Sequence, residues 1–87
     1  MKYVIFKGNG CYHPVLFADH TTHSQIKVEN ATPISAGFVK FNSMNEPTCY
    51  GKADSLKIES NPEQDEQIIH LWQRNHGMSM FIDYDSL

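Results

Sequence analysis

At 87 residues with a formal net charge of −3, the chain is long enough for one domain, residues 1–87, and too short for a second hydrophobic core. A hydrophobic fraction of 40% and an aromatic fraction of 11% suffice for a core and exclude a disordered chain. The acidic balance, without a lysine or arginine cluster, argues against nucleic acid as a partner, because neutralisation of phosphates supplies most of that affinity. No apolar run reaches the roughly 20 residues of a membrane span, and Lys7 ends the first one early, so we expect no membrane partner and a cytoplasmic location.

The first residues predict a β-hairpin. Lys2–Lys7 is short and rich in β-branched and aromatic residues, as strands are. Gly8-Asn9-Gly10 is typical of turns between antiparallel strands. Pro14–Ala18 is the expected second strand, with Pro14 at its start because proline cannot donate to a ladder. Residues 8–13 are long for a tight turn, so we expect an exposed loop at the tip.

The middle of the chain predicts a short helix and a second hairpin. Threonines at its start favour one or two helical turns near residues 21–27. Ile34–Phe41 forms a third strand, in which Ser35-Ala36-Gly37 indicates close packing or a bulge. Polar residues then separate it from a partner strand at Thr48–Lys52. Ser55–Glu59 alternates, so the fourth strand either continues into it or turns into a fifth.

The segment from Ser60 to Gly77 is the clearest element in the sequence. Ser60 or Asn61 is a good N-cap, and Pro62 suits the first turn. Acidic residues complement the positive end of the helix dipole, and Gly77 offers the left-handed residue that ends helices. The residues predicted to form the apolar face are Ile68, Ile69, Leu71 and Trp72.

Strands followed by one good helix predict the α+β class: an antiparallel sheet of four to five strands, with a C-terminal amphipathic helix packed on one face. A small barrel of the OB or SH3 kind is the alternative architecture. Met78, Met80, Ile82 and Tyr84 alternate with Ser79, Phe81, Asp83 and Asp85 and are a candidate final short strand.

Histidines carry the main hint of chemistry. Asp19, His20 and His23 place two imidazoles three residues apart beside a carboxylate, which is a weak candidate metal site. Structural zinc sites normally show a second ligand pair, and catalytic ones an HExxH helix, and the chain has neither. A polar loop whose histidines face water is the preferred interpretation, so no metal or other cofactor is expected.

No enzyme is predicted. Cys11 and His13 share one loop, but a hairpin tip does not supply the enclosed, positive surroundings that activate a thiol. Cys49 is expected to be a buried strand residue. Both cysteines are expected to be free thiols, although a single disulfide between them stays open. Glu63, Asp65 and Glu66 are expected on an exposed first helical turn, and therefore not as acid–base catalysts.

The C-terminal third is the candidate partner interface. Residues 59–87 hold one arginine and six acidic residues, which suits a basic protein partner if these acids do more than complement the helix dipole. If the last residues are not a strand, their apolar side chains form an adaptable patch. The interface residues that we expect are Met78, Met80, Phe81, Asp83, Tyr84 and Asp85.

Four blocks together resemble a known group of proteins. They are Pro14-Val15-Leu16-Phe17-Ala18-Asp19-His20, Ile34-Ser35-Ala36-Gly37-Phe38-Val39, Cys49-Tyr50-Gly51-Lys52-Ala53-Asp54-Ser55-Leu56 and Asn61-Pro62-Glu63-Gln64-Asp65-Glu66. Their order is similar to that in short, mostly uncharacterised proteins carried by phages and prophages. The resemblance implies a context and no site residues: such proteins commonly bind a host protein and alter it.

These features favour a small non-enzymatic protein-binding module that modulates or inhibits a host or defence protein. One alternative is a small metal- or ligand-binding protein that uses Asp19, His20 and His23. Another is a structural homodimer that pairs an exposed strand edge.

Overall fold

The computed structural model describes residues 1–76 and confirms the α+β class: an antiparallel sheet of four strands, a second small sheet and one long helix. The elements in chain order are β1 (Lys2–Gly8), β2 (Cys11–Phe17), the 3-10 helix η1 (His23–Gln25), β3 (Thr32–Phe41), β4 (Pro47–Tyr50), β5 (Lys52–Ala53), β6 (Ile58–Glu59) and α1 (Pro62–His76). The short helix expected near residues 21–27 is thus one 3-10 turn. The predicted final strand lies outside the described residues.

The first hairpin is tighter than the sequence suggested. β1 and β2 are joined by Asn9 and Gly10, whose φ angles of 54° and 74° are both left-handed, as the favoured two-residue hairpin turn requires. The expected loop over residues 8–13 is therefore wrong, because the ladder continues to the pair Gly8–Cys11. Pro14 lies in the middle of β2, opposite Ile5, and is tolerated there because β2 is an edge strand.

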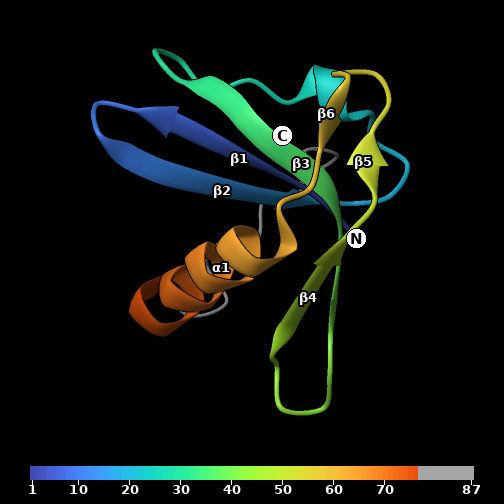
Figure 1. Cartoon of the computed structure of the whole chain (residues 1–87), viewed down its shortest axis with the longest axis vertical. Helices are drawn as coiled ribbons and strands as arrows, with labels where there is room; N and C mark the ends of the chain where they lie inside the picture. Colours follow the sequence, from blue (N-terminus) through green and yellow to red (C-terminus); the bar gives the residue numbers. More distant parts are fainter. Residues whose placement is uncertain (77–87) are drawn as a thin grey trace.

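The main sheet has the order β2-β1-β3-β4, and both of its faces are covered. Alternate residues of β1 enter two different cores, as the period of a strand dictates, so the expectation that the chain is too short for a second core is wrong. α1 packs against β4 and β2 on one face, while η1, β5 and β6 contact β1 and β3 from the other (Figure 1). We call these the helix side and the loop side of the sheet.

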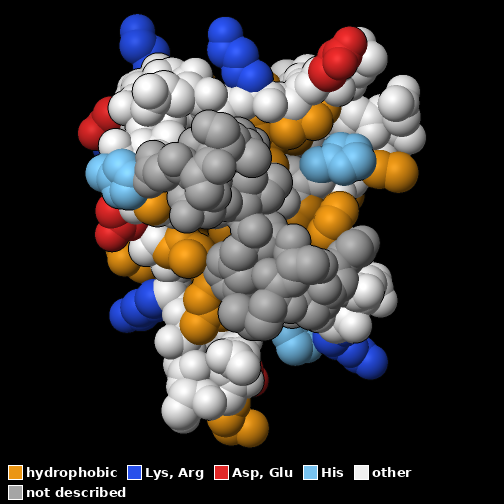
Figure 2. All heavy atoms as spheres, turned by 180° about the vertical axis from the view of Figure 1, so that it is seen from behind, with side chains coloured by type: hydrophobic (Ala, Val, Ile, Leu, Met, Phe, Trp, Pro, Cys, Tyr) orange, Lys and Arg blue, Asp and Glu red, His pale blue; other side chains and the backbone are white. Residues whose placement is uncertain are grey.

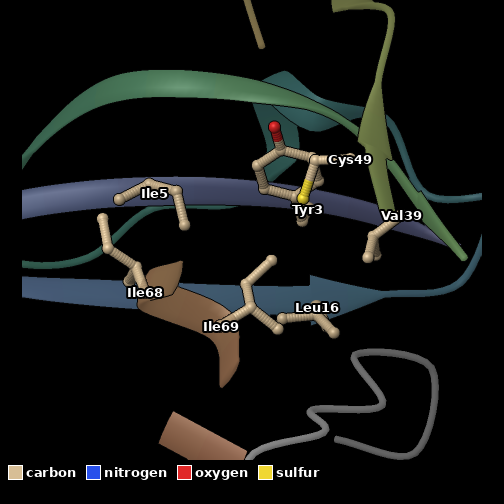
Figure 3. Packing of buried hydrophobic residues seen from close by; sticks show 7 residues of the cluster. All are labelled: Tyr3, Ile5, Leu16, Val39, Cys49, Ile68 and Ile69. Atoms are coloured by element: carbon tan, nitrogen blue, oxygen red, sulfur yellow. The ribbon is translucent and has the colours of Figure 1, made fainter. Parts of the chain in front are cut away.

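The helix-side core joins α1 to all four strands. Figure 3 shows Ile68 and Ile69 of the helix facing side chains from the sheet. The buried members are Tyr3, Ile5, Leu16, Val39, Cys49, Ile68 and Ile69, and Phe41 and Trp72 pack at the edge. Leu71 is 55% exposed, so its predicted place on the buried face is wrong. It lies three residues after Ile68, but on the far side of Ile68 from Ile69 and Trp72.

The loop-side core is closed by irregular segments. Its buried members are Val4, Phe6, Val15, Phe17, Ile26, Ala36 and Ala53. The chain turns after β5 and returns as β6, so Lys52–Ala53 and Ile58–Glu59 form a separate two-stranded sheet beside β3. Ser55–Glu59 therefore consists of part of a turn followed by the short strand β6.

Close packing is found at one of the small residues of β3, and a bulge lies directly before them, at Ile34. The register against β1 shifts between Ile5 and Phe6, which leaves Ile34 without a partner in a bulge. A Cβ on Gly37 would lie 2.5 Å from the carbonyl oxygen of Tyr50, so this position has room for glycine alone. Among the described residues, no helix combines the length and apolar character that a membrane span needs.

Candidate functional site

A buried carboxylate lies between the helix and the sheet. Asp65 belongs to the first turns of α1, and its side chain is fully buried. It accepts a short hydrogen bond from the Tyr3 hydroxyl on β1 and a 2.6 Å bond from Ser35 Oγ on β3. The Asn61 backbone N–H donates to it at 2.9 Å, and Gln64 Nε2 lies 3.4 Å away. These four donors match the acceptor capacity of one carboxylate.

The thiol of Cys49 completes this polar cluster. Figure 3 shows Cys49 beside the Tyr3 ring, within the apolar core. Burial raises the pKa of the Cys49 thiol to about 12, and it also raises the pKa of the Tyr3 phenol above its ordinary 10.0. The thiol is therefore protonated at neutral pH and is a poor nucleophile. Tyr3, Ser35, Cys49 and Asp65 are all at most 3% exposed, so the cluster is part of the packing between α1 and the sheet.

A second carboxylate of α1 protects the edge of the sheet. β4 is an edge strand, and the backbone N–H of Cys49 donates to Glu66 Oε2 at 2.8 Å. An edge amide left free is a template for pairing with another chain. Glu66 thus covers one of the positions that a homodimer built through β4 would use.

Between β4 and α1 lies an acidic groove. Its volume is about 330 Å³, and it is lined by Glu46, Pro47, Glu63, Glu66, Gln67 and His70. Three of the six lining residues are glutamates and none is lysine or arginine. Gln73 Nε2 donates to the Asn45 carbonyl at 3.1 Å, which holds the β3–β4 turn against the helix beyond the groove. The groove therefore has two walls of regular structure and a negative lining.

Large apolar side chains are exposed on the same two parts of the chain. Met44 in the β3–β4 turn is 77% exposed, and Leu71 follows the groove residue His70 on α1. Figure 2 shows that, on the face seen from behind, hydrophobic side chains reach the surface both toward the middle and at parts of the margin, whereas lysine and arginine side chains lie at the margins. Exposed apolar groups beside charged ones are typical of protein-binding surfaces.

The three weak metal candidates do not come together. Asp19 is exposed and forms a 2.9 Å salt bridge with the N-terminal amine, and its hydrogen bond to that amine lowers its pKa. His23 is buried on the loop side, where its Nε2 lies 2.8 Å from the Gly37 carbonyl. No group of three or more histidine, cysteine, aspartate or glutamate residues within residues 1–76 is placed to hold a metal ion. The preferred picture of water-facing histidines is wrong for His23.

His23 is instead a core residue. Its ring makes edge contacts with Phe17, at 5.4 Å between centroids, and with Phe38, at 5.7 Å. Because a carbonyl oxygen can only accept a hydrogen bond, Nε2 of the neutral ring carries the hydrogen and Nδ1 carries none. Burial lowers the pKa of His23 below its ordinary 6.5.

The two cysteines are free thiols, Cys11 exposed and Cys49 buried, so the disulfide that the sequence left open is not formed. His13 lies in contact with the Trp72 ring, at 6.4 Å between centroids. The predicted interface residues Met78, Met80, Phe81, Asp83, Tyr84 and Asp85 lie outside the described residues.

The burial of Asp65 differs from the exposed first helical turn that its sequence context predicts. A signal was present: Asp65 precedes Ile68 and Ile69 by three and four residues, so all three share one helix face. The helix dipole favours Glu63, Asp65 and Glu66 alike, but only Asp65 lies on the buried face of the helix.

Comparisons of this chain with protein-family models, with curated proteins and with solved structures found no match.

Proposed function

We propose that this chain is a small non-enzymatic protein-binding module, and that the acidic groove receives a basic segment of its partner. The observation that carries the proposal is the groove itself, in which three carboxylates line a cleft between an edge strand and a helix. Complementary charge across an interface steers encounter and selects partners. The exposed Met44 and Leu71 supply apolar contacts on the same elements.

The kind of partner follows from the resemblance to phage and prophage proteins. A host or defence protein whose activity changes on binding is the partner that this resemblance implies. Phe81 and Tyr84, which the sequence predicts as interface residues, are further candidate contacts with the partner, since aromatic side chains commonly anchor interfaces.

The first experiment is affinity capture from a host lysate, followed by titration of the purified partner by calorimetry. We expect the double variant Glu46→Gln/Glu63→Gln to bind about tenfold more weakly, because each exposed charge pair contributes up to about 1 kcal/mol. The same variant should also show a smaller loss of affinity as salt is raised. Glu66 is left unchanged because it bonds the Cys49 amide.

The matched control is Glu29→Gln/Glu59→Gln, which removes two exposed glutamates outside the groove. Equal affinity of both double variants would rule out the groove as the binding site. A second arm replaces Phe81 and Tyr84 by serine and asks whether affinity falls while the unfolding midpoint is kept. If both serine variants unfold and no partner is captured, the proposed contact surface at Phe81 and Tyr84 is wrong.

A further inference from the structure

A second cavity lies on the loop side of the sheet, and it differs in chemistry from the acidic groove. Its volume is about 270 Å³, and most of its wall is apolar. The apolar lining residues are Phe6, Ile26, Val28, Ala31, Pro33 and Leu56. Phe6 and Ile26 are each only 3% exposed and belong to the loop-side core, so the cavity extends from the surface down to buried side chains.

The polar lining of this cavity is positive. It consists of Ser24 and Lys27, which lie in and after η1, and it contains no carboxylate. No acidic side chain among residues 1–76 forms a salt bridge with Lys27. The Ser24 hydroxyl and the Lys27 ammonium, which has no acidic partner in the described part of the chain, are groups that would bind a carboxylate attached to a hydrocarbon chain.

We propose that the loop-side cavity binds a small carboxylic acid with an apolar chain. Its size is just below the usual range of about 300–1,000 Å³ for drug-sized ligands, which favours a short aliphatic chain. The chain would lie against Phe6, Ile26 and Leu56, and the carboxylate would pair with Lys27. This site is on the opposite side of the sheet from α1, and it does not depend on the proposed protein-binding function.

The test uses octanoate as the probe and follows the backbone amides of the full chain by NMR. We expect saturable shifts confined to residues 24–33, Phe6 and Leu56. Octylammonium, which has the same chain and the opposite charge, should bind at least about tenfold more weakly, because its headgroup meets Lys27. Equal binding of the two probes, or shifts spread over the whole surface, would overturn the proposal.

The variant Lys27→Gln should weaken octanoate binding about tenfold, the usual value of one charge-assisted hydrogen bond. Lys27 is exposed, so this change is compatible with folding. The matched control is Lys57→Gln, which removes an exposed lysine next to Leu56 that does not line the cavity. If both variants bind octanoate as the natural chain does, the assigned role of Lys27 is wrong and the proposal fails.

Discussion

At the scale of single residues, Asp65 connects α1 to two strands of the sheet through buried hydrogen bonds. A carboxylate removed from water costs several kcal/mol unless hydrogen bonds replace its hydration. Tyr3, Ser35 and the Asn61 amide supply those bonds from three separate parts of the chain. The same bonds satisfy the buried hydroxyls, so the carboxylate and its donors stabilise one another.

Asp65→Asn tests this dependence. Asparagine keeps the size of the side chain but turns one acceptor oxygen into a donor, which then opposes a hydroxyl or the Asn61 amide. We expect a loss of about 1–3 kcal/mol in the free energy of unfolding, measured by urea titration, because a buried donor that loses its acceptor costs about that much.

Glu63→Gln is the matched control for Asp65→Asn. It makes the same chemical change on an exposed residue of the same helix, and it should cost less than about 0.5 kcal/mol. A double-mutant cycle with Tyr3→Phe should give a coupling energy of about 1 kcal/mol or more. Additive losses would mean that the Tyr3–Asp65 bond does not hold the helix.

At the scale of elements, α1 both covers the helix-side core and satisfies a backbone group at the edge of the sheet. Its apolar residues close the helix-side core, and Glu66 satisfies the Cys49 amide at the free edge of β4. The opposite edge strand, β2, contains Pro14, which has no backbone N–H to offer a further strand. Trp72 Nε1 donates a hydrogen bond to the carbonyl of Tyr12 on the same strand, at 3.2 Å. One helix thus contacts both outer strands of the sheet.

Glu66→Ala should expose the edge of β4. The freed Cys49 amide becomes available for pairing with a second chain, so we expect concentration-dependent association, measured by light scattering. The free energy of unfolding should fall by about 1–3 kcal/mol through the lost charged hydrogen bond. Glu66→Gln, which retains an acceptor oxygen, should stay closer to the natural chain in both measurements. Association of the glutamine variant to the same degree as the alanine variant would show that the bond is not what protects the edge.

At the scale of the whole molecule, the two sides of the sheet bury titratable groups of opposite behaviour. His23 on the loop side has a lowered pKa, and Cys49 and Tyr3 on the helix side have raised ones. In each case folding favours the neutral form, because burial removes the charged form from water. Stability is therefore expected to have a plateau between an acidic and an alkaline limit.

The acidic limit belongs to His23. The unfolded chain binds a proton at His23 with the ordinary pKa of 6.5 and the folded chain binds it less readily, so the contribution of His23 to stability is present above pH 6.5 and lost below it.

The alkaline limit is set by Cys49 and Tyr3. Their contribution is present below about pH 9, the ordinary pKa of the thiol, and is lost as pH rises towards about 12. Urea titrations from pH 5 to pH 11 would measure both limits.

His23→Gln should flatten the acidic side of that profile, because glutamine has an amide donor for the Gly37 carbonyl and does not titrate. His70→Gln, at an exposed position of α1, should leave the slope unchanged. If the slope below pH 6.5 persists in His23→Gln, another group sets the acidic limit.

Local signals in the sequence determined the first turn and the long helix of this protein. Asn9-Gly10 specifies its turn through φ angles that most residues avoid, and the capping residues with the 3.6-residue period specify α1 between Pro62 and His76. They also sufficed for the α+β class, because an antiparallel sheet with one good helix has few ways to bury its apolar faces. These effects act within a few residues, so they can be read from the chain itself.

Only the tertiary structure decided which polar groups lie inside. Asp65 is buried because Tyr3 and Ser35, 62 and 30 residues away in the chain, place their hydroxyls over that point of the helix. His23 is in the core because Phe17, Phe38 and the Gly37 carbonyl surround it. The acidic groove likewise exists only where β4 and α1 meet. Burial and hydrogen bonding depend on neighbours that the fold brings together, and a pattern along the sequence does not contain them.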